Sequence, residues 1–141
     1  MLPPQKQKQA VDSDAVERLG GELAALVGAD WHRRDYGVAV SGGPDSMALL
    51  WLMASLLPGQ VRAATVDHGL RSGSAEEARM VAAFCAREHI PHATLTPDSP
   101  IAGSLQAAAR TARYDLLDGW RREQGIDFIV TAHHADDQLE T

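Results

Sequence analysis

The sequence predicts an α/β fold: a doubly wound parallel sheet with helices on both faces, as in Rossmann-like proteins. Short apolar runs alternate with longer segments of helical periodicity, and continuous apolar strands are typical of parallel sheets covered on both faces. Proline or glycine follows each of the later helical segments, where a helix is expected to end. With 141 residues, 45% of them hydrophobic, the chain suits one compact domain.

The first helix is predicted to begin at Asp14, which Glu17 follows at the spacing of a helix start. Apolar residues then recur at helical spacing as far as Val27. The preceding residues 1–13 are largely polar, hold the only two lysines of the chain, and are expected to form a mobile leader. The folded domain is therefore predicted to occupy residues 14–141.

Four strands and three more helices are predicted to alternate after this helix. The strands are Val38–Ser41, Val61–Asp67, His92–Thr96 and Phe128–Ala132, and the helices are Pro44–Leu57, Ala75–His89 and Ser104–Gln124. Ligand groups are expected at the carboxyl ends of the strands, as in other doubly wound sheets. The chain stops at Thr141, about one turn into a further predicted helix. We therefore expect a domain that is incomplete at its C-terminus, with the fourth strand as an unpaired edge.

Composition excludes several classes of protein. Thirteen basic residues against nineteen acidic ones give a net charge of -6, so a nucleic-acid partner would need a local basic patch. Cys85 is the only cysteine, which excludes an internal disulfide and a multi-cysteine metal site. The chain has neither a secretory signal nor the roughly 20 consecutive apolar residues of a membrane span. We expect a soluble, cytoplasmic protein without a membrane partner.

The strongest chemical signal is the turn after the first strand, which consists of Ser41, Gly42, Gly43, Pro44, Asp45 and Ser46. This turn opens a helix, whose N–H groups and dipole favour an anion such as phosphate. It is neither a Walker A loop nor a dinucleotide fingerprint. A carboxylate about 4 Å from a phosphate oxygen costs about 4 kcal/mol at an effective dielectric constant of about 20, so Asp45 predicts a bridging Mg²⁺. Alternatively, the segment is an ordinary strand–helix turn, and Asp45 only complements the helix dipole.

Two further groups of residues are candidates for a nucleotide site. Asp67, His68 and Gly69 follow the second strand and would face the same crevice as the glycine turn. Alternatively, they form an ordinary turn that Gly69 closes. Arg110 and Arg113 share one face of a helix, where two guanidinium groups would suit phosphates or an RNA backbone. A solvated, salt-bridged helix face is the alternative.

A third group follows the fourth strand and contains Asp136, Asp137 and Glu140. Carboxylates at this position are candidates to bind a divalent metal or a basic substrate, or to act as a general base. Alternatively, the two aspartates cap the next helix and complement its dipole. Cys85 lies on an apolar helical stripe and is expected in the core.

Taken together, these segments resemble a known family. The SGGPDS turn and its apolar helix resemble the PP-loop of the N-type ATP pyrophosphatases. Within that superfamily, the segments VDHGLR (66–71), QAAARTARY (106–114) and TAHHADDQLET (131–141) are similar to the N-terminal domain of the tRNA(Ile)-lysidine synthetases. The resemblance implies a sheet of the adenine-nucleotide alpha hydrolase type over residues 37–141.

The resemblance also implies an activity, with ATP and Mg²⁺ as cofactors and with L-lysine and tRNA(Ile) bearing a CAU anticodon as partners. ATP would adenylate the C2 oxygen of the wobble cytidine and release pyrophosphate, and the amine of lysine would then displace AMP. Carried over by position, the ATP-binding residues are Ser41, Gly42, Gly43, Pro44, Asp45, Ser46, Asp67, His68 and Gly69, with Asp45 also on the metal. Asp136, Asp137 and Glu140 would serve lysine or metal binding, and the catalytic residues would be Asp45, Arg110, Arg113 and Asp137.

Other readings stay open. A related PP-loop enzyme such as a tRNA thiolase commonly needs additional cysteines, which this chain lacks. A nucleotide-binding module without catalysis is the alternative from a different class. The enzymes of the resembled family continue well beyond this point, so we expect this chain alone to bind ATP–Mg²⁺ at best. Whether the protein forms a homodimer stays open.

Overall fold

The computed structural model describes residues 3–67, 74–97 and 105–132, with side chains over 13–67, 75–97 and 110–132. Its centre is a four-stranded sheet in the order β3-β2-β1-β4. The strands are β1 (Tyr36–Ala39), β2 (Val61–Val66), β3 (His92–Leu95) and β4 (Phe128–Thr131). All neighbouring strands are parallel, and Val38 in the middle of β1 pairs with Ala63 on one side and Val130 on the other.

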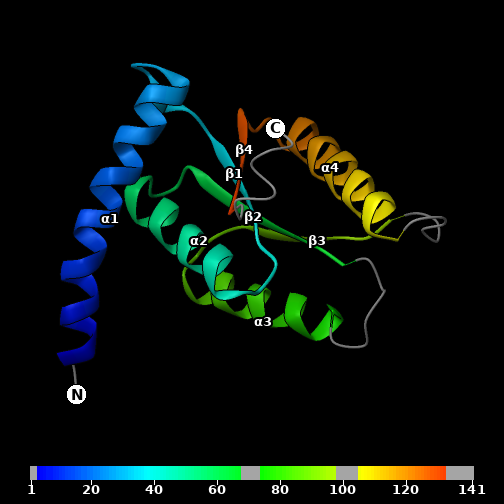
Figure 1. Ribbon diagram of the computed structural model, residues 1–141, viewed down its shortest axis with the longest axis horizontal. Helices are drawn as coiled ribbons and strands as arrows, with labels where there is room; N and C mark the ends of the chain where they lie inside the picture. The colour runs from blue at the N-terminus through cyan, green and yellow to red at the C-terminus, as the bar shows by residue number, and fades with distance from the viewer. Residues whose placement is uncertain (1–2, 68–73, 98–104, 133–141) are drawn as a thin grey trace.

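Helices cover both faces of this sheet (Figure 1). They are α1 (Pro3–Val27), α2 (Pro44–Leu56), α3 (Ser74–Arg87) and α4 (Leu105–Gln124), with a short 3-10 helix, η1 (Trp31–Arg33), before β1. The helices α2 and α3 lie on one face, α4 lies on the other, and α1 packs beside α2. The predicted doubly wound α/β fold is therefore confirmed. None of the helices in the described ranges combines the length and apolar character that a bilayer span requires.

Alternate residues of β1 face different helical layers, as the pleat of a strand dictates. Tyr36, Val38 and Val40 belong to the larger core, together with side chains of α1, α2 and α3. Ala39 packs against the smaller core beneath α4, which includes Leu117 and Trp120. The central strand is thus buried on both sides, which explains its continuous apolar sequence.

At Gly37, β1 lies close to Trp120 of α4. A Cβ atom added at this glycine would lie 2.6 Å from Cζ3 of Trp120 and 3.0 Å from Cδ1 of Ile129. Real Cβ atoms do not come so near to other heavy atoms, because dense packing leaves no such overlap. The missing side chain therefore makes room for the indole ring that seats α4 on the sheet.

The predicted strands and later helices are all present, with bounds within two residues of the expected ones. The first helix is different: it begins at Pro3, and the prediction of a start at Asp14 is wrong. Residues 5–12 contain no glycine or proline and include several good helix formers, while prolines fit the first helical turn. The division into a mobile leader over residues 1–13 and a domain over 14–141 stays a prediction.

Candidate functional site

The candidate site lies at the carboxyl edge of the sheet, at the end of the central strand β1. The helix after β1, α2, covers one face, whereas α4, which precedes β4, covers the other. Because β1 lies between β2 and β4, the helix that joins β1 to β2 and the helix that leads into β4 cover opposite faces of the sheet. Doubly wound sheets bind ligands at the carboxyl ends of the strands where the strand order reverses in this way.

The glycine turn after β1 has a backbone suited to an anion. Gly42 has a φ of +95°, a backbone conformation that residues other than glycine rarely adopt. Gly43 is the N-cap of α2 and provides no side-chain cap, and Pro44 occupies the first helical turn. The N–H of Met47 donates to the carbonyl of Gly43 at 3.1 Å and begins the helical hydrogen bonds. The positive end of the α2 dipole therefore faces the crevice without a capping side chain.

The two serines of the turn occupy different positions. Ser46 is buried, with 6% of its surface exposed, and its hydroxyl accepts the N–H of Ser41 at 3.1 Å and lies 3.2 Å from the carbonyl of Gly43. Ser41 is exposed, and its Oγ lies 3.1 Å from that of Ser46. The hydroxyl of Ser46 thus closes the turn from inside, whereas the hydroxyl of Ser41 lies at the surface.

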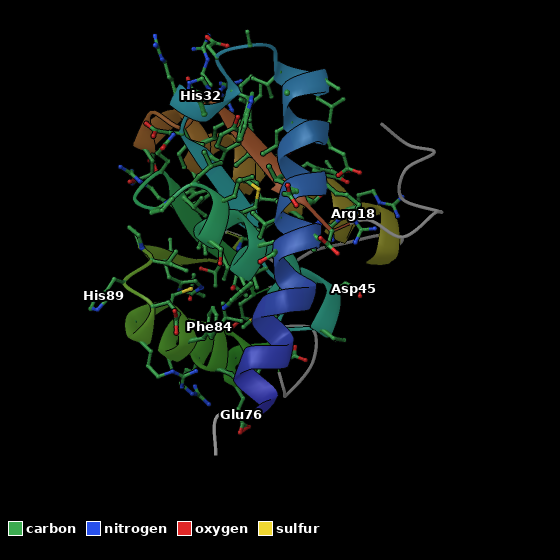
Figure 2. All side chains as sticks on the ribbon, turned by 90° about the vertical axis from the view of Figure 1, so that its left-hand side faces the viewer. Arg18, His32, Asp45, Glu76, Phe84 and His89 are labelled. Carbon is green, nitrogen blue, oxygen red and sulfur yellow. The ribbon has the colours of Figure 1, made fainter. Side chains whose placement is uncertain are left out.

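Asp45 is exposed in the first turn of α2. Figure 2 shows its side chain on the outer side of the helix start, away from the core. No three His, Cys, Asp or Glu side chains gather into a metal-binding group within the described part of the chain. A single carboxylate beside an anion site suits Mg²⁺, which is commonly held by one or two carboxylates together with substrate phosphates and water.

Asp67 lies directly after β2, and β2 pairs with β1, the strand that precedes the glycine turn. Its N–H donates to the carbonyl of Leu95 at 2.8 Å, which continues the ladder between β2 and β3. Its side chain is half-buried. The structure therefore places Asp67 and the turn at the ends of neighbouring strands, while His68 and Gly69 lie outside the described residues.

Arg110 and Arg113 lie in the first half of α4, and both are partly buried. Arg113 is four residues before Leu117, a member of the core beneath α4, so it belongs to the face of the helix that meets the sheet. Its guanidinium carbon lies 5.1 Å from the ring centre of Tyr114. The buried Nε of Arg113 has no hydrogen-bond acceptor among the described residues, as is also true of the Nε of Arg34; Arg113 remains a candidate to bind an anion through its charge.

The remaining predicted residues, Asp136, Asp137 and Glu140, lie outside the described residues. Within the described part, the structure brings the glycine turn and Asp67 to the ends of neighbouring strands, and Arg110 and Arg113 remain candidates on α4.

Sequence reasoning missed the contact between α3 and the glycine turn. A Cβ atom built on Gly42 would lie 3.5 Å from Cβ of Glu77, 3.6 Å from Cε of Met80 and 3.8 Å from Cγ2 of Val81. The i, i+3, i+4 spacing of these three residues shows that they share a helix face. The spacing was visible in the sequence, but nothing local indicated that this face meets the turn.

Comparison with known proteins agrees with this geometry. A family model described as a PP-loop domain matches residues 16–141. Over 129 residues, the chain is 47% identical to a tRNA(Ile)-lysidine synthase of Novosphingobium aromaticivorans, covering 89% of this chain and 39% of that protein. Over 106 residues it is 50% identical to the enzyme of the same name from Zymomonas mobilis, covering 74% of this chain and 32% of that protein. The chain thus spans about a third of the length of these relatives.

Solved structures share the fold at low sequence identity. A U34-tRNA thiolase from Methanococcus maripaludis superimposes with a TM-score of 0.72 at 16% identity, covering 91% of this chain and 48% of that chain. An NH3-dependent NAD synthetase from Campylobacter jejuni does so with a TM-score of 0.64 at 14% identity, covering 93% and 58%. At such identities the likeness concerns the fold alone, and it agrees with the adenine-nucleotide alpha hydrolase type expected above.

Proposed function

Because the chain belongs to the PP-loop domain family, we propose that it binds ATP together with Mg²⁺ at the glycine turn. The turn supports this proposal, since it opens α2 at the carboxyl edge of the sheet without a side-chain cap. Asp45 fits the cation, because its carboxylate would otherwise repel the phosphates that the turn attracts.

We further propose that the chain is the ATP-binding part of a tRNA(Ile)-lysidine synthase. Identities of 47% and 50% to two enzymes of that name support this most directly. In the proposed reaction, the C2 oxygen of the wobble cytidine attacks the α-phosphorus of ATP, and the bond to pyrophosphate breaks. The amine of L-lysine then attacks C2, AMP leaves, and the amine loses a proton. We infer a cytoplasmic location from the tRNA substrate with its CAU anticodon.

The residues of the turn are proposed to have distinct roles in the first step. The backbone of Gly42 and Gly43 and the exposed hydroxyl of Ser41 hold the pyrophosphate portion of ATP. Pro44 begins the helix there, and buried Ser46 keeps the turn in shape. Bound Mg²⁺ would neutralise charge that develops on the leaving pyrophosphate, and Asp45 would hold it.

Arg113 and Arg110 are proposed to stabilise the same developing charge from the opposite face of the sheet. A guanidinium whose Nε is buried without an acceptor among the described residues gains most from an anion placed beside it. Asp67 would border the adenosine, together with His68 and Gly69. For the amine of lysine or a second metal contact, we propose Asp136, Asp137 and Glu140, with Asp137 as the catalytic residue of that group.

The rival reading as a thiolase finds little support in the chemistry of this chain. Its only cysteine, Cys85, is fully buried in the larger core, and burial raises the pKa of its thiol to about 11. A thiol with such a pKa is almost entirely protonated at neutral pH and is a poor nucleophile.

The experiment that tests ATP binding compares Asp45→Asn with Glu76→Gln by calorimetry, with and without Mg²⁺. Glu76 is a matched control, because it is also an exposed acidic residue in the first turn of a helix. We expect Asp45→Asn to weaken ATP binding in Mg²⁺ by about tenfold or more, and to strengthen it in EDTA, where the carboxylate only repels phosphate. Weaker binding of Asp45→Asn under both conditions would contradict a role through the cation.

The lysidine proposal is tested with a chimaera in which this chain replaces the matching 129 residues of the Novosphingobium enzyme. We expect the chimaera to catalyse exchange between ATP and pyrophosphate that depends on tRNA(Ile), and to incorporate lysine. Nucleotide binding without exchange would instead favour a module that binds ATP and performs no chemistry. Sedimentation of the 141-residue chain would show whether it forms a homodimer.

A further inference from the structure

Two groups of residues surround the glycine turn: Ser46, which is part of the turn, and the facing side of α3, which is not. On the inner side, the hydroxyl of Ser46 bonds to the backbone of Ser41 and lies beside the carbonyl of Gly43. On the other side, α3 lies against Gly42, with Cε of Met80 3.6 Å from the position of a Cβ at this glycine. A glycine has no side chain to pack, so its neighbours must restrain it.

Met80 is an unusual residue in this position. Half of its surface is exposed (51%), whereas the next residue, Val81, is fully buried in the core. Burial in the core therefore does not account for an apolar side chain at position 80. The terminal methyl group of Met80 borders the space that a Cβ at position 42 would occupy, and the flexible thioether is suited to fill irregular space.

We propose that Met80 is a positioning residue for the phosphate-binding turn. Its side chain lies beside Gly42 and keeps the backbone N–H groups of residues 41–43, 45 and 46 in the arrangement that receives phosphate. The inference rests on the proposed function, since it assigns to the turn the phosphates of ATP.

The test compares Met80→Ala, Met80→Leu and Leu26→Ala in the 141-residue chain. Leu26 is the control, because it is a helical apolar residue with 84% of its surface exposed. We expect Met80→Ala to raise the Kd for ATP–Mg²⁺ about tenfold, since small displacements of a binding group are costly. Its Tm should change no more than that of Leu26→Ala, and Met80→Leu should restore most of the affinity.

Hydrogen exchange of the free protein distinguishes positioning from direct contact with the ligand. If Met80 supports the turn, the hydrogen-bonded amides of Ser41 and Gly43 exchange faster in Met80→Ala than in the wild type, before any nucleotide is added. Unchanged exchange in the turn would overturn the proposal, even if ATP bound more weakly. So would equal losses of affinity in Met80→Ala and Leu26→Ala. A wild-type chain that binds no ATP would contradict the proposed function instead, while the exchange rates would still decide the role of Met80.

Discussion

Replacing Ser46 by alanine is expected to destabilise the protein, although the residue belongs to a phosphate-binding sequence. The buried hydroxyl accepts a hydrogen bond from the N–H of Ser41 at 3.1 Å and donates one to the carbonyl of Gly43 at 3.2 Å. Each such hydrogen bond contributes about 0.5–1.5 kcal/mol, and a buried partner left unsatisfied costs about as much or more. The free energy of unfolding should therefore fall by about 1–3 kcal/mol.

Ser41→Ala is the matched variant, because Ser41 is exposed. Its hydroxyl accepts the N–H of Gly43 at 3.3 Å and shares a 3.1 Å hydrogen bond with the hydroxyl of Ser46. We expect its stability to change by less than about 0.5 kcal/mol, and its affinity for ATP–Mg²⁺ to fall. Urea denaturation without nucleotide measures the first quantity, and calorimetry with ATP measures the second. If Ser46→Ala were as stable as the wild type, or if Ser41→Ala were the less stable of the two, the assignment of the inner and outer hydroxyls would be refuted.

Gly37→Ala should lower the free energy of unfolding by about 1–3 kcal/mol or more, because the new methyl group would overlap Trp120. Gly21→Ala, whose new methyl group would meet nothing within 4 Å, should raise the free energy of unfolding by up to about 1 kcal/mol. Equal urea midpoints for the two variants would contradict this difference. Iodoacetamide at about pH 8 should label Cys85 only during unfolding, since burial raises its pKa to about 11; rapid labelling of the folded protein would show that the thiol is accessible. Burial lowers the pKa of His92, so the imidazole binds a proton more tightly in the unfolded chain than in the folded protein. The free energy of unfolding should therefore be highest above about pH 6.5 and fall as the pH drops below it. His92→Gln should remove this part of the pH dependence of the urea midpoint, and an unchanged slope would point to other groups.

The order and type of the elements could be predicted because each has a local cause. Strands such as β2 read as short apolar runs, and helices such as α3 show a recurring apolar face before a proline or glycine ends them. The start of α1 could not be predicted in the same way. Residues 5–12 lack apolar periodicity, and a pattern-based reading needs that periodicity to recognise a helix, whereas helix-forming residues can extend an existing helix without it.

The candidate site was predicted in its parts and only partly in its arrangement. The turn at Ser41–Ser46 and Asp67 could be placed at one edge, because parallel strands end on the same side of a sheet. In the sequence nothing distinguishes Ser41 from Ser46, because both are hydroxyl residues at the ends of the same glycine-containing segment. The fold of the turn separates them, since one hydroxyl is buried as an acceptor for backbone and the other faces solvent.

The sequence by itself determined the alternating strands and helices, the acidic phosphate-type turn and the family resemblance, because these depend on residues that are close along the chain. Only the tertiary structure decided that Met80 lies against Gly42, that Gly37 makes room for Trp120, and that the Nε of Arg113 is buried without an acceptor among the described residues. Such contacts join segments tens of residues apart. They depend on how helices pack on the sheet, and no local pattern specifies that packing.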